Sequence, residues 1–259
     1  MTAPHDRFRA LHERGLFLLP NPWDVGSARL LESLGFEALA TTSSGLAAAL
    51  GKLDQQVTRD ELVAHVAAVT AAVTIPLNVD AERCFDDIAP TVGRLAEAGA
   101  AGLSIEDYDP TTERVDSLAT GAARVAEAAE ACARHGLVLT ARAENHLYGH
   151  DDLDDTIERL RAYRAAGADV VYAPGLRAPA DIARLVDSVD APVNVLAVTG
   201  APPVAELEKL GVRRVSTGGS LAWAAYGALR DAARELQRSG TTTFRDHALT
   251  ADEIDRALS

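Results

Sequence analysis

Short apolar runs and amphipathic stretches alternate along the whole chain. The amphipathic stretches are rich in alanine, and several end at a glycine, the residue favoured just past a helix C-terminus. Each of these glycines precedes an apolar or β-branched run, which is typical of a strand buried on both faces of a parallel sheet. With three further runs that lack such a glycine, the predicted strand segments are residues 16–19, 35–42, 76–79, 99–107, 136–144, 167–173, 192–197 and 211–218.

Eight predicted helices fill the intervals between these runs. They span residues 24–34, 58–73, 86–98, 120–135, 151–166, 179–189, 203–210 and 219–238. Eight strand–helix units without a linker favour a closed (β/α)8 TIM barrel over an open doubly wound sheet. The first strand is followed by NPWDVG, which lacks the glycine-rich loop of a dinucleotide-binding fold. We expect a barrel over residues 1–240 and a C-terminal helical extension over residues 241–259.

Charge and composition exclude several classes of partner and mechanism. The 259 residues include 25 basic and 38 acidic side chains, a net charge of −13, so we expect neither nucleic acid nor an anionic membrane as a partner. No apolar run approaches the roughly 18 residues that span a bilayer, and the N-terminus lacks a signal-peptide core, which indicates a cytoplasmic protein. Neither lysine, Lys52 or Lys209, is an obvious Schiff-base residue. The spacing of Cys84 and Cys132 predicts two reduced thiols.

Carboxylates and one arginine follow three consecutive predicted strands. Asp80 and Glu82 follow the third strand, Glu106 the fourth and Arg142 the fifth. Barrel enzymes carry their active sites at this end of the strands, and carboxylates that converge there repel one another unless a cation neutralises them. We therefore expect Mg²⁺, with Mn²⁺ as an alternative, at Asp80, Glu82 and Glu106. Arg142 is expected to bind a small anionic substrate.

Several other polar residues at this predicted rim leave alternatives open. Asp107 and Glu144 are more typical of helix caps or solvated loop charges. His146 follows Arg142 in the same loop and is a candidate acid or base. The small residues 41–46 would let backbone amides approach an anion, or would form a turn that caps the next helix.

The chain resembles the isocitrate lyase and phosphoenolpyruvate mutase superfamily over nearly its whole length. The matching blocks are NPWDVGSARLLESLGFEALATTSSGLAAALG, PLNVDAE, GLSIED, ARAE and AGADVVYAP. The resemblance implies a (β/α)8 barrel, a homotetramer or homodimer whose C-terminal helix is exchanged between subunits, and Mg²⁺-dependent cleavage of a C–C or P–C bond beside a 2-oxo acid. It also implies that Asp80 is the direct metal ligand and that Glu82 and Glu106 hold waters on the metal.

The same resemblance implies substrate contacts. Ser44 and the backbone amides of Gly45 and Leu46 are the implied pocket for the substrate carboxylate, opposite Arg142. Asp54 is the implied residue that positions water or substrate. The metal and the arginine would stabilise the enolate that forms when the bond beside the ketone breaks.

The loop after the fourth strand departs from the family pattern. Lyases of the superfamily carry a Lys-Lys-Cys-Gly-His type sequence there, whose cysteine is the acid, and the phosphorus-handling members carry a lysine. Residues 107–117 read DYDPTTERVDS, and Glu82 replaces the usual aspartate. Decarboxylation of an oxaloacetate-like acid is therefore favoured, because CO₂ leaves without a proton and solvent can protonate the enolate. The alternatives are a methylisocitrate-type lyase, a phosphonopyruvate-type enzyme and a non-catalytic barrel that binds a 2-oxo acid.

Overall fold

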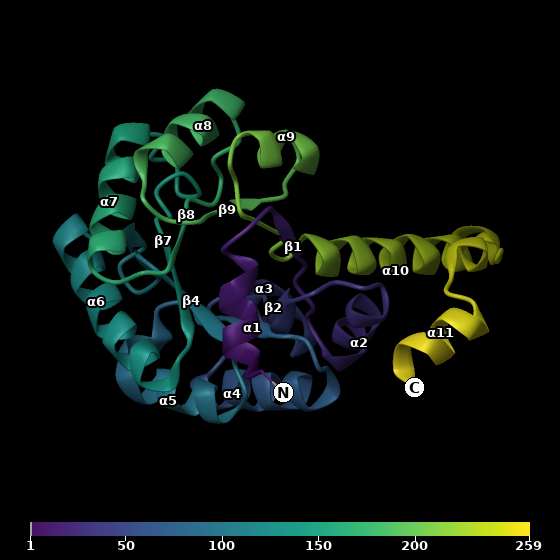
Figure 1. Cartoon of the computed structure of the whole chain (residues 1–259). Coiled ribbons are helices and arrows are strands. Elements are labelled where there is room, and N and C mark those ends of the chain that lie inside the picture. The colour runs from purple at the N-terminus through teal and green to yellow at the C-terminus, as the bar shows by residue number, and fades with distance from the viewer. Residues whose placement is uncertain (1) are drawn as a thin grey trace.

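An eight-stranded parallel sheet rolls into a barrel in the computed structural model, which describes residues 2–259 (Figure 1). Its strand order is β1-β10-β9-β8-β7-β4-β3-β2. The strands are β1 Phe17–Leu19, β2 Leu39–Ala40, β3 Leu77–Asp80, β4 Gly102–Glu106, β7 Val138–Arg142, β8 Val170–Tyr172, β9 Val193–Leu196 and β10 Arg214–Ser216. A backbone hydrogen bond of 3.0 Å from Ala40 N to Pro20 O bridges the seam between β1 and β2. The predicted barrel and its eight strands are confirmed.

Helices follow each strand of the barrel, and all but the last of them, α10, connect successive strands around its outside. They are α2 Val25–Ser33, α4 Arg59–Ala72, α5 Ile88–Glu97, α6 Leu118–His135, α7 Leu153–Ala165, α8 Pro179–Ser188, α9 Val204–Lys209 and α10 Ser220–Ser239. Side-chain caps begin several of them: Asp24 accepts from Ser27 N, and Thr58 accepts from Glu61 N. All eight predicted helices are confirmed.

The sequence pattern missed three short elements. They are α1 Pro4–Leu11, α3 Ser43–Ala49 and a hairpin of β5 Tyr108–Asp109 with β6 Arg114–Val115. Phe8 of α1 is fully buried and packs in a cluster with residues at the N-terminal ends of the strands, including Phe17, Val138 and Val170. Helix α1 therefore covers the N-terminal end of the barrel and leaves the opposite end for a site. Cys84 and Cys132 are buried free thiols, as expected.

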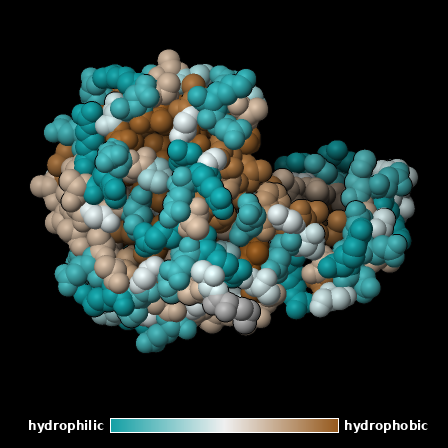
Figure 2. All heavy atoms as spheres, viewed as in Figure 1, coloured by the Kyte–Doolittle hydropathy of each residue, from teal (hydrophilic) through white to brown (hydrophobic). Residues whose placement is uncertain are grey.

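The C-terminal part of the chain leaves the barrel. Helix α10 projects away from it, and α11 Ala251–Leu258 returns to pack against α2, where the Arg29 guanidinium donates to the Leu258 carbonyl (Figure 1). The space-filling view shows apolar side chains on this projecting C-terminal part and on the adjoining flank of the barrel (Figure 2). Within residues 2–259, no helix is long and apolar enough to cross a membrane.

Candidate active site

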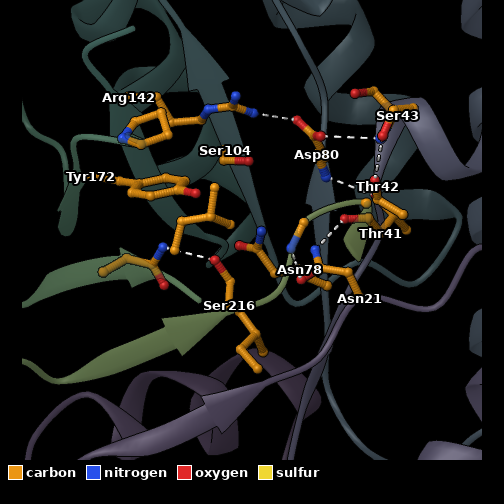
Figure 3. Close-up of a pocket in the computed structure, with 18 of the residues that line it drawn as sticks. Asn21, Thr41, Thr42, Ser43, Asn78, Asp80, Ser104, Arg142, Tyr172 and Ser216 are labelled. Atoms are coloured by element: carbon orange, nitrogen blue, oxygen red, sulfur yellow. Dashed lines mark hydrogen bonds and ion pairs between the residues drawn. The ribbon is translucent and has the colours of Figure 1, made fainter. Parts of the chain in front are cut away.

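A cavity of about 190 Å³ lies among the C-terminal ends of the strands (Figure 3). Every barrel strand, or the residue or two that follow it, contributes to its wall. One contribution from each, in chain order, is Asn21, Thr41, Asp80, Ser104, Arg142, Tyr172, Leu196 and Ser216. The wall is strongly polar for a barrel interior, which indicates a site for a polar ligand.

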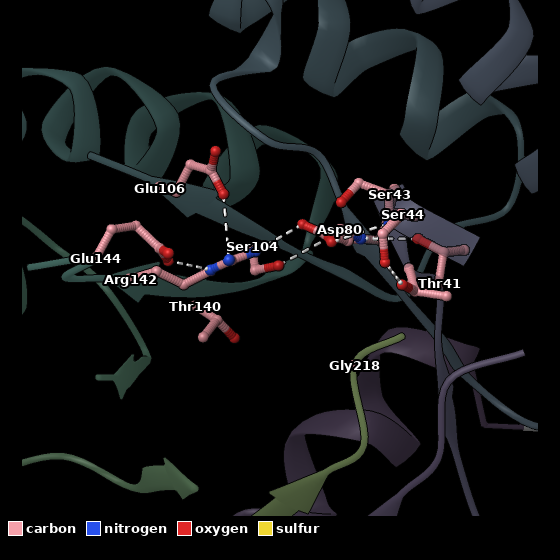
Figure 4. A network of polar contacts seen from close by, with 12 residues as sticks. Thr41, Ser43, Ser44, Asp80, Ser104, Glu106, Thr140, Arg142, Glu144 and Gly218 are labelled. Atoms are coloured by element: carbon pink, nitrogen blue, oxygen red, sulfur yellow. Dashed lines mark hydrogen bonds and ion pairs between the residues drawn. The ribbon is translucent and has the colours of Figure 1, made fainter. Parts of the chain in front are cut away.

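Arg142 is surrounded by three carboxylates at one side of this cavity (Figure 4). Its Nη1 lies 2.8 Å from Asp80 Oδ1, its Nη2 lies 3.2 Å from Glu106 Oε2, and its Nε lies 2.6 Å from Glu144 Oε1. Burial raises the pKa of Glu106 well above its usual range, and Arg142 opposes that shift. Burial likewise raises the pKa of Glu144. One guanidinium therefore faces more negative charge than it can neutralise when all three groups are ionised.

Asp80 is fixed at the mouth of the cavity by two neighbouring elements. Ser43 N, at the start of α3, donates to Asp80 Oδ2 at 3.1 Å, and Asp80 N donates to Thr41 Oγ1 at 2.8 Å. With Arg142 on its other oxygen, the carboxylate has a single orientation. Both oxygens of this predicted metal ligand are therefore held by other groups, which fixes the direction in which the carboxylate faces.

The predicted pocket for the substrate carboxylate is only partly formed. Ser44 lines the cavity. Gly45 N donates to Thr42 Oγ1 at 3.4 Å, and Leu46 N donates to Thr42 O at 3.0 Å, so both amides are used inside α3. Gly45 is required by packing, because a Cβ there would lie 2.6 Å from Thr42 Cγ2 and 2.9 Å from Trp23 Cβ. The structure thus brings Ser44 to the cavity and keeps the Gly45 and Leu46 amides within the helix.

Two other predicted carboxylates lie close to Asp80. Asp54 lines the cavity, and its pKa is raised by burial and then by Asp80. Glu82 is buried, and burial, followed by Asp80 and Asp54, raises its pKa to about 8. Gln55 Nε2 donates to Glu106 Oε1 at 3.1 Å and so joins the Asp54 loop to the end of β4. These mutual effects on pKa place all four carboxylates in one electrostatic cluster.

The donor set fits a divalent cation that is held mainly through water. Within residues 2–259, no three His, Cys, Asp or Glu side chains gather closely enough to form a complete metal cage. Mg²⁺ does not require one, since it commonly takes one or two protein carboxylates and completes its shell with water and substrate oxygens. Asp80 supplies an oriented carboxylate, and the buried carboxyl groups of Glu82 and Glu106, whose pKa values burial raises, would supply further oxygens beside it once a cation favours their ionised form.

The structure does not bring His146 into the cavity. Its Nε2 lies 2.9 Å from Thr156 Oγ1 and its Nδ1 lies 3.3 Å from Asp151 Oδ1. These contacts hold the ring, whose side chain is 7% exposed, inside the loop after β7. Leu147, the next residue, lines the cavity instead.

The interpretation of Asp107 and Glu144 as capping or solvated charges is wrong. Both side chains are buried, because partners within the fold satisfy them. Asp107 Oδ2 accepts from the Tyr163 hydroxyl at 2.6 Å and from Arg159 at 3.2 Å, and Asp107 Oδ1 accepts from Glu144 N at 2.8 Å. Asp107 therefore joins the ends of β4 and β7 to α7, and Glu144 belongs to the Arg142 cluster.

Sequence reasoning missed the polar residues inside the strands. Asn78, Ser104, Asn194 and Arg214 all line the cavity. These residues lie inside the apolar runs that predict the strands. Asn78 lies two positions before Asp80, and Arg214 lies two positions before Ser216, and both Asp80 and Ser216 are at the rim. Alternate residues of a strand share a face, so this spacing of two is the signal that could have found them.

Comparison with known proteins agrees with the fold. A family model described as phosphoenolpyruvate phosphomutase matches residues 8–237. An uncharacterized protein of Mycobacterium tuberculosis is 35% identical over 82% of this chain and 81% of its own length. An oxaloacetate decarboxylase of Paraburkholderia xenovorans is 33% identical over 94% of this chain and 85% of its own length.

A solved structure is closer still. A putative lyase/mutase from Burkholderia cenocepacia is 46% identical, covers 98% of this chain and 94% of its own, and superposes with a TM-score of 0.93. The family match covers most of the chain, and the blocks that suggested it surround the cavity. The chain therefore belongs to the phosphoenolpyruvate mutase family, within the isocitrate lyase and phosphoenolpyruvate mutase superfamily of lyases and mutases.

Proposed function

We propose that this protein cleaves a C–C bond in a small 2-oxo or 2-hydroxy di- or tricarboxylic acid with the help of Mg²⁺ or Mn²⁺, and that decarboxylation of an oxaloacetate-like acid is its reaction. The observation that carries the proposal is the cluster of Arg142 with Asp80, Glu106 and Glu144 at the wall of the cavity. Such a cluster combines an excess of negative charge, which suits a cation, with a guanidinium that can turn toward an anionic substrate. The decarboxylase relative from Paraburkholderia xenovorans supports the choice of reaction.

Each group in the cavity has a defined task in this proposal. Asp80 would hold the metal directly, and Glu82 and Glu106 would hold it through water. The bound ion would polarise the 2-oxo group of the substrate. Ser44 and Arg142 would orient the substrate carboxylate by hydrogen bonds, and Asp54 would position water or substrate at the open side.

Decarboxylation suits the loop that this chain carries after β4. The bond between C3 and the departing carboxylate breaks, its electron pair forms the enolate of pyruvate, and a proton from water then gives pyruvate. CO₂ leaves uncharged, so the reaction requires no acid beside the leaving group. The loop holds no thiol or lysine, and its hairpin is fixed by Tyr108, whose ring stacks on Tyr148 at a centroid distance of 3.6 Å.

We also propose that the subunits form a homodimer or homotetramer in which helix α10 is exchanged, while the C-terminal helix α11 stays against α2 of its own subunit. Ala222 is the one buried side chain on α10 among the described residues. Leu229 and Leu236 are 64% and 49% exposed. The outer side of β1 and β10, where the eighth helix of a closed ring would pack, has an apolar hollow of about 410 Å³. An exchanged α10 would bury both apolar surfaces.

The substrate is tested by offering the purified full chain four acids in Mg²⁺ buffer: oxaloacetate, methylisocitrate, dimethylmalate and phosphonopyruvate. Release of pyruvate or glyoxylate is measured, with EDTA as the control. We expect EDTA-sensitive turnover of oxaloacetate above its spontaneous rate. Turnover of methylisocitrate alone would support the alternative lyase, and tight oxalate binding without any turnover would support a non-catalytic 2-oxo acid barrel.

A further inference from the structure

Arg214 lies at the floor of the active-site cavity, on β10, and only 2% of the residue is exposed. Its guanidinium donates to Asn194 Oδ1 at 2.8 Å and to Thr140 Oγ1 at 3.0 Å. A third contact joins its Nη1 to His12 Nε2 at 3.3 Å. Arginine cannot accept a hydrogen bond, so His12 must be the acceptor and its ring must be neutral.

The other contact of His12 shows which ring nitrogen carries the proton. Its Nδ1 lies 2.9 Å from the carbonyl oxygen of Phe8, which can only accept. Burial, followed by the charge of Arg214, lowers the pKa of His12 to about 3. All three hydrogen-bond partners of Arg214 are therefore uncharged.

Arg142 and Arg214 both line the cavity, but the first is surrounded by charged groups and the second by neutral ones. Arg142 faces Asp80, Glu106 and Glu144. Within residues 2–259, no carboxylate lies within ion-pair distance of Arg214. Burial lowers the pKa of Arg214 to about 9, so its guanidinium stays protonated at neutral pH. A buried charge without a counter-charge is destabilising unless another group supplies one.

A second group on the same wall also lacks a partner. The side-chain oxygen of Asn78 is buried without a hydrogen bond among the described residues, and Asn78 lines the cavity. Buried polar groups in native proteins are nearly always satisfied, by the protein itself, by water or by a ligand. The floor thus holds a cation without a counter-charge and an amide oxygen without a donor, on two residues that both line the cavity.

We propose that Arg214 binds a carboxylate of the substrate, so that the site selects acids with two carboxylates over acids with one. The inference rests on the proposed function, because it assumes that the 2-oxo or 2-hydroxy acid end of the substrate occupies the Arg142 side. There Arg142 is already balanced by protein carboxylates. Arg214 carries the positive charge that no protein group neutralises, and a second carboxylate would supply the missing counter-charge through a charge-assisted contact.

Two stable acids test this selection by calorimetric binding in Mg²⁺ buffer. L-Malate and 2-hydroxybutyrate differ only in that a methyl group replaces one carboxylate. We expect wild-type protein to bind malate about tenfold or more tightly, which is the range of one charge-assisted hydrogen bond. In Arg214→Gln the preference should vanish while affinity for 2-hydroxybutyrate is kept. Arg213→Gln should retain the preference, because Arg213 directly precedes β10 and its guanidinium donates to the Gly15 carbonyl.

The variants also separate ligand binding from a purely structural role. Arg214→Met removes the buried charge without adding a polar group, so it serves if Arg214→Gln does not fold. Arg214→Lys keeps the charge and should keep part of the malate preference. A wild-type protein that binds both acids equally, or a charge-free variant that still prefers malate, would overturn the role of Arg214 alone. A wild-type protein that binds neither acid would overturn the proposed function as well.

Discussion

Single side chains in this barrel derive their chemistry from burial combined with a few specific contacts. Arg142 and Arg214 line the same cavity, yet one is surrounded by carboxylates and the other by neutral groups. His12 shows the same control at the floor, where Arg214 and the carbonyl of Phe8 fix it in one neutral tautomer. The identity of a residue therefore says little about its charge here until its partners are known.

The neutrality of His12 predicts how stability depends on pH. The pKa of His12 is about 3 in the folded protein, against an ordinary value of 6.5. Below pH 6.5 the unfolded chain gains a proton that the folded protein does not, so this contribution to stability is lost as the pH falls. Urea unfolding between pH 5 and pH 7 should show wild type losing about 1.4 kcal/mol per pH unit below 6.5 relative to His12→Gln.

His247→Gln, at an exposed position, is the control for removing a histidine. Other titrating groups are common to wild type and variant, so the difference between them isolates His12. If the difference in free energy of unfolding stays constant across this pH range, His12 is not the buried neutral group described above.

At the scale of elements, glycines and apolar runs were sufficient to predict the barrel. Each strand–helix unit carries its own local signals, and short connections leave few ways to arrange eight of them. Helix α3 was not predicted, because its sequence, SSGLAAA, is also typical of a turn of small residues. The structure shows that Thr42 caps it as a helix. The β5–β6 hairpin escaped because two-residue strands carry no periodicity.

Strand positions alone predict the candidate site only where a strand ends, whereas Ser44 and Asp54, which also line the cavity, are implied by the family resemblance. Asp80, Glu106 and Arg142 were found because chain position alone places them at the rim. The direction of a loop side chain depends on contacts that are distant in sequence, so the orientation of His146 toward Thr156 could not be predicted. Arg214 was not predicted, because it lies within a run of strand residues and differs from its neighbours only in that its side chain points into the barrel.

Asp107 joins two strand ends to α7, and removing one oxygen atom from a partner of Asp107 should weaken this junction. Tyr163→Phe removes the hydroxyl that donates to Asp107 Oδ2 at 2.6 Å and leaves the ring packed against Gly121 of α6. The loss of a buried hydrogen bond to a charged group should lower the free energy of unfolding by about 1.5–3 kcal/mol. Urea titration measures the change. Tyr148→Phe, at a residue that is 43% exposed, is the control, and equal stability of the two variants would contradict the role of this junction.

At the scale of the whole molecule, the arm formed by α10 packs little against the rest of residues 2–259, since Ala222 is its one buried side chain there. Its apolar residues recur at spacings of three and four and form one stripe, composed of Ala222, Tyr226, Leu229, Ala233 and Leu236. Such a stripe is typical of a helix that packs against another protein surface. The proposed exchange between subunits gives this stripe a place to pack.

Self-association tests the arm directly. Leu229→Glu places a charge in the middle of the stripe, so light scattering coupled to size exclusion should show a smaller species than the wild-type dimer or tetramer. Gln237→Glu adds the same charge at an exposed position off the stripe and should leave the oligomer intact. A monomeric wild-type protein, or a Leu229→Glu variant that assembles normally, would contradict the proposed exchange.

The central claim is that the cavity at the C-terminal rim is a metal-assisted site in which Asp80 is the principal protein ligand. The most direct measurement is pyruvate release from oxaloacetate by wild type and Asp80→Ala, each with Mg²⁺ and with EDTA. Asp187→Ala, at an exposed position on α8, is the matched control, and circular dichroism checks the fold of each protein. We predict that EDTA or Asp80→Ala lowers the rate by about 100-fold or more, while Asp187→Ala matches wild type. Wild-type turnover that persists in EDTA, or a folded Asp80→Ala protein with a normal rate, would contradict the account.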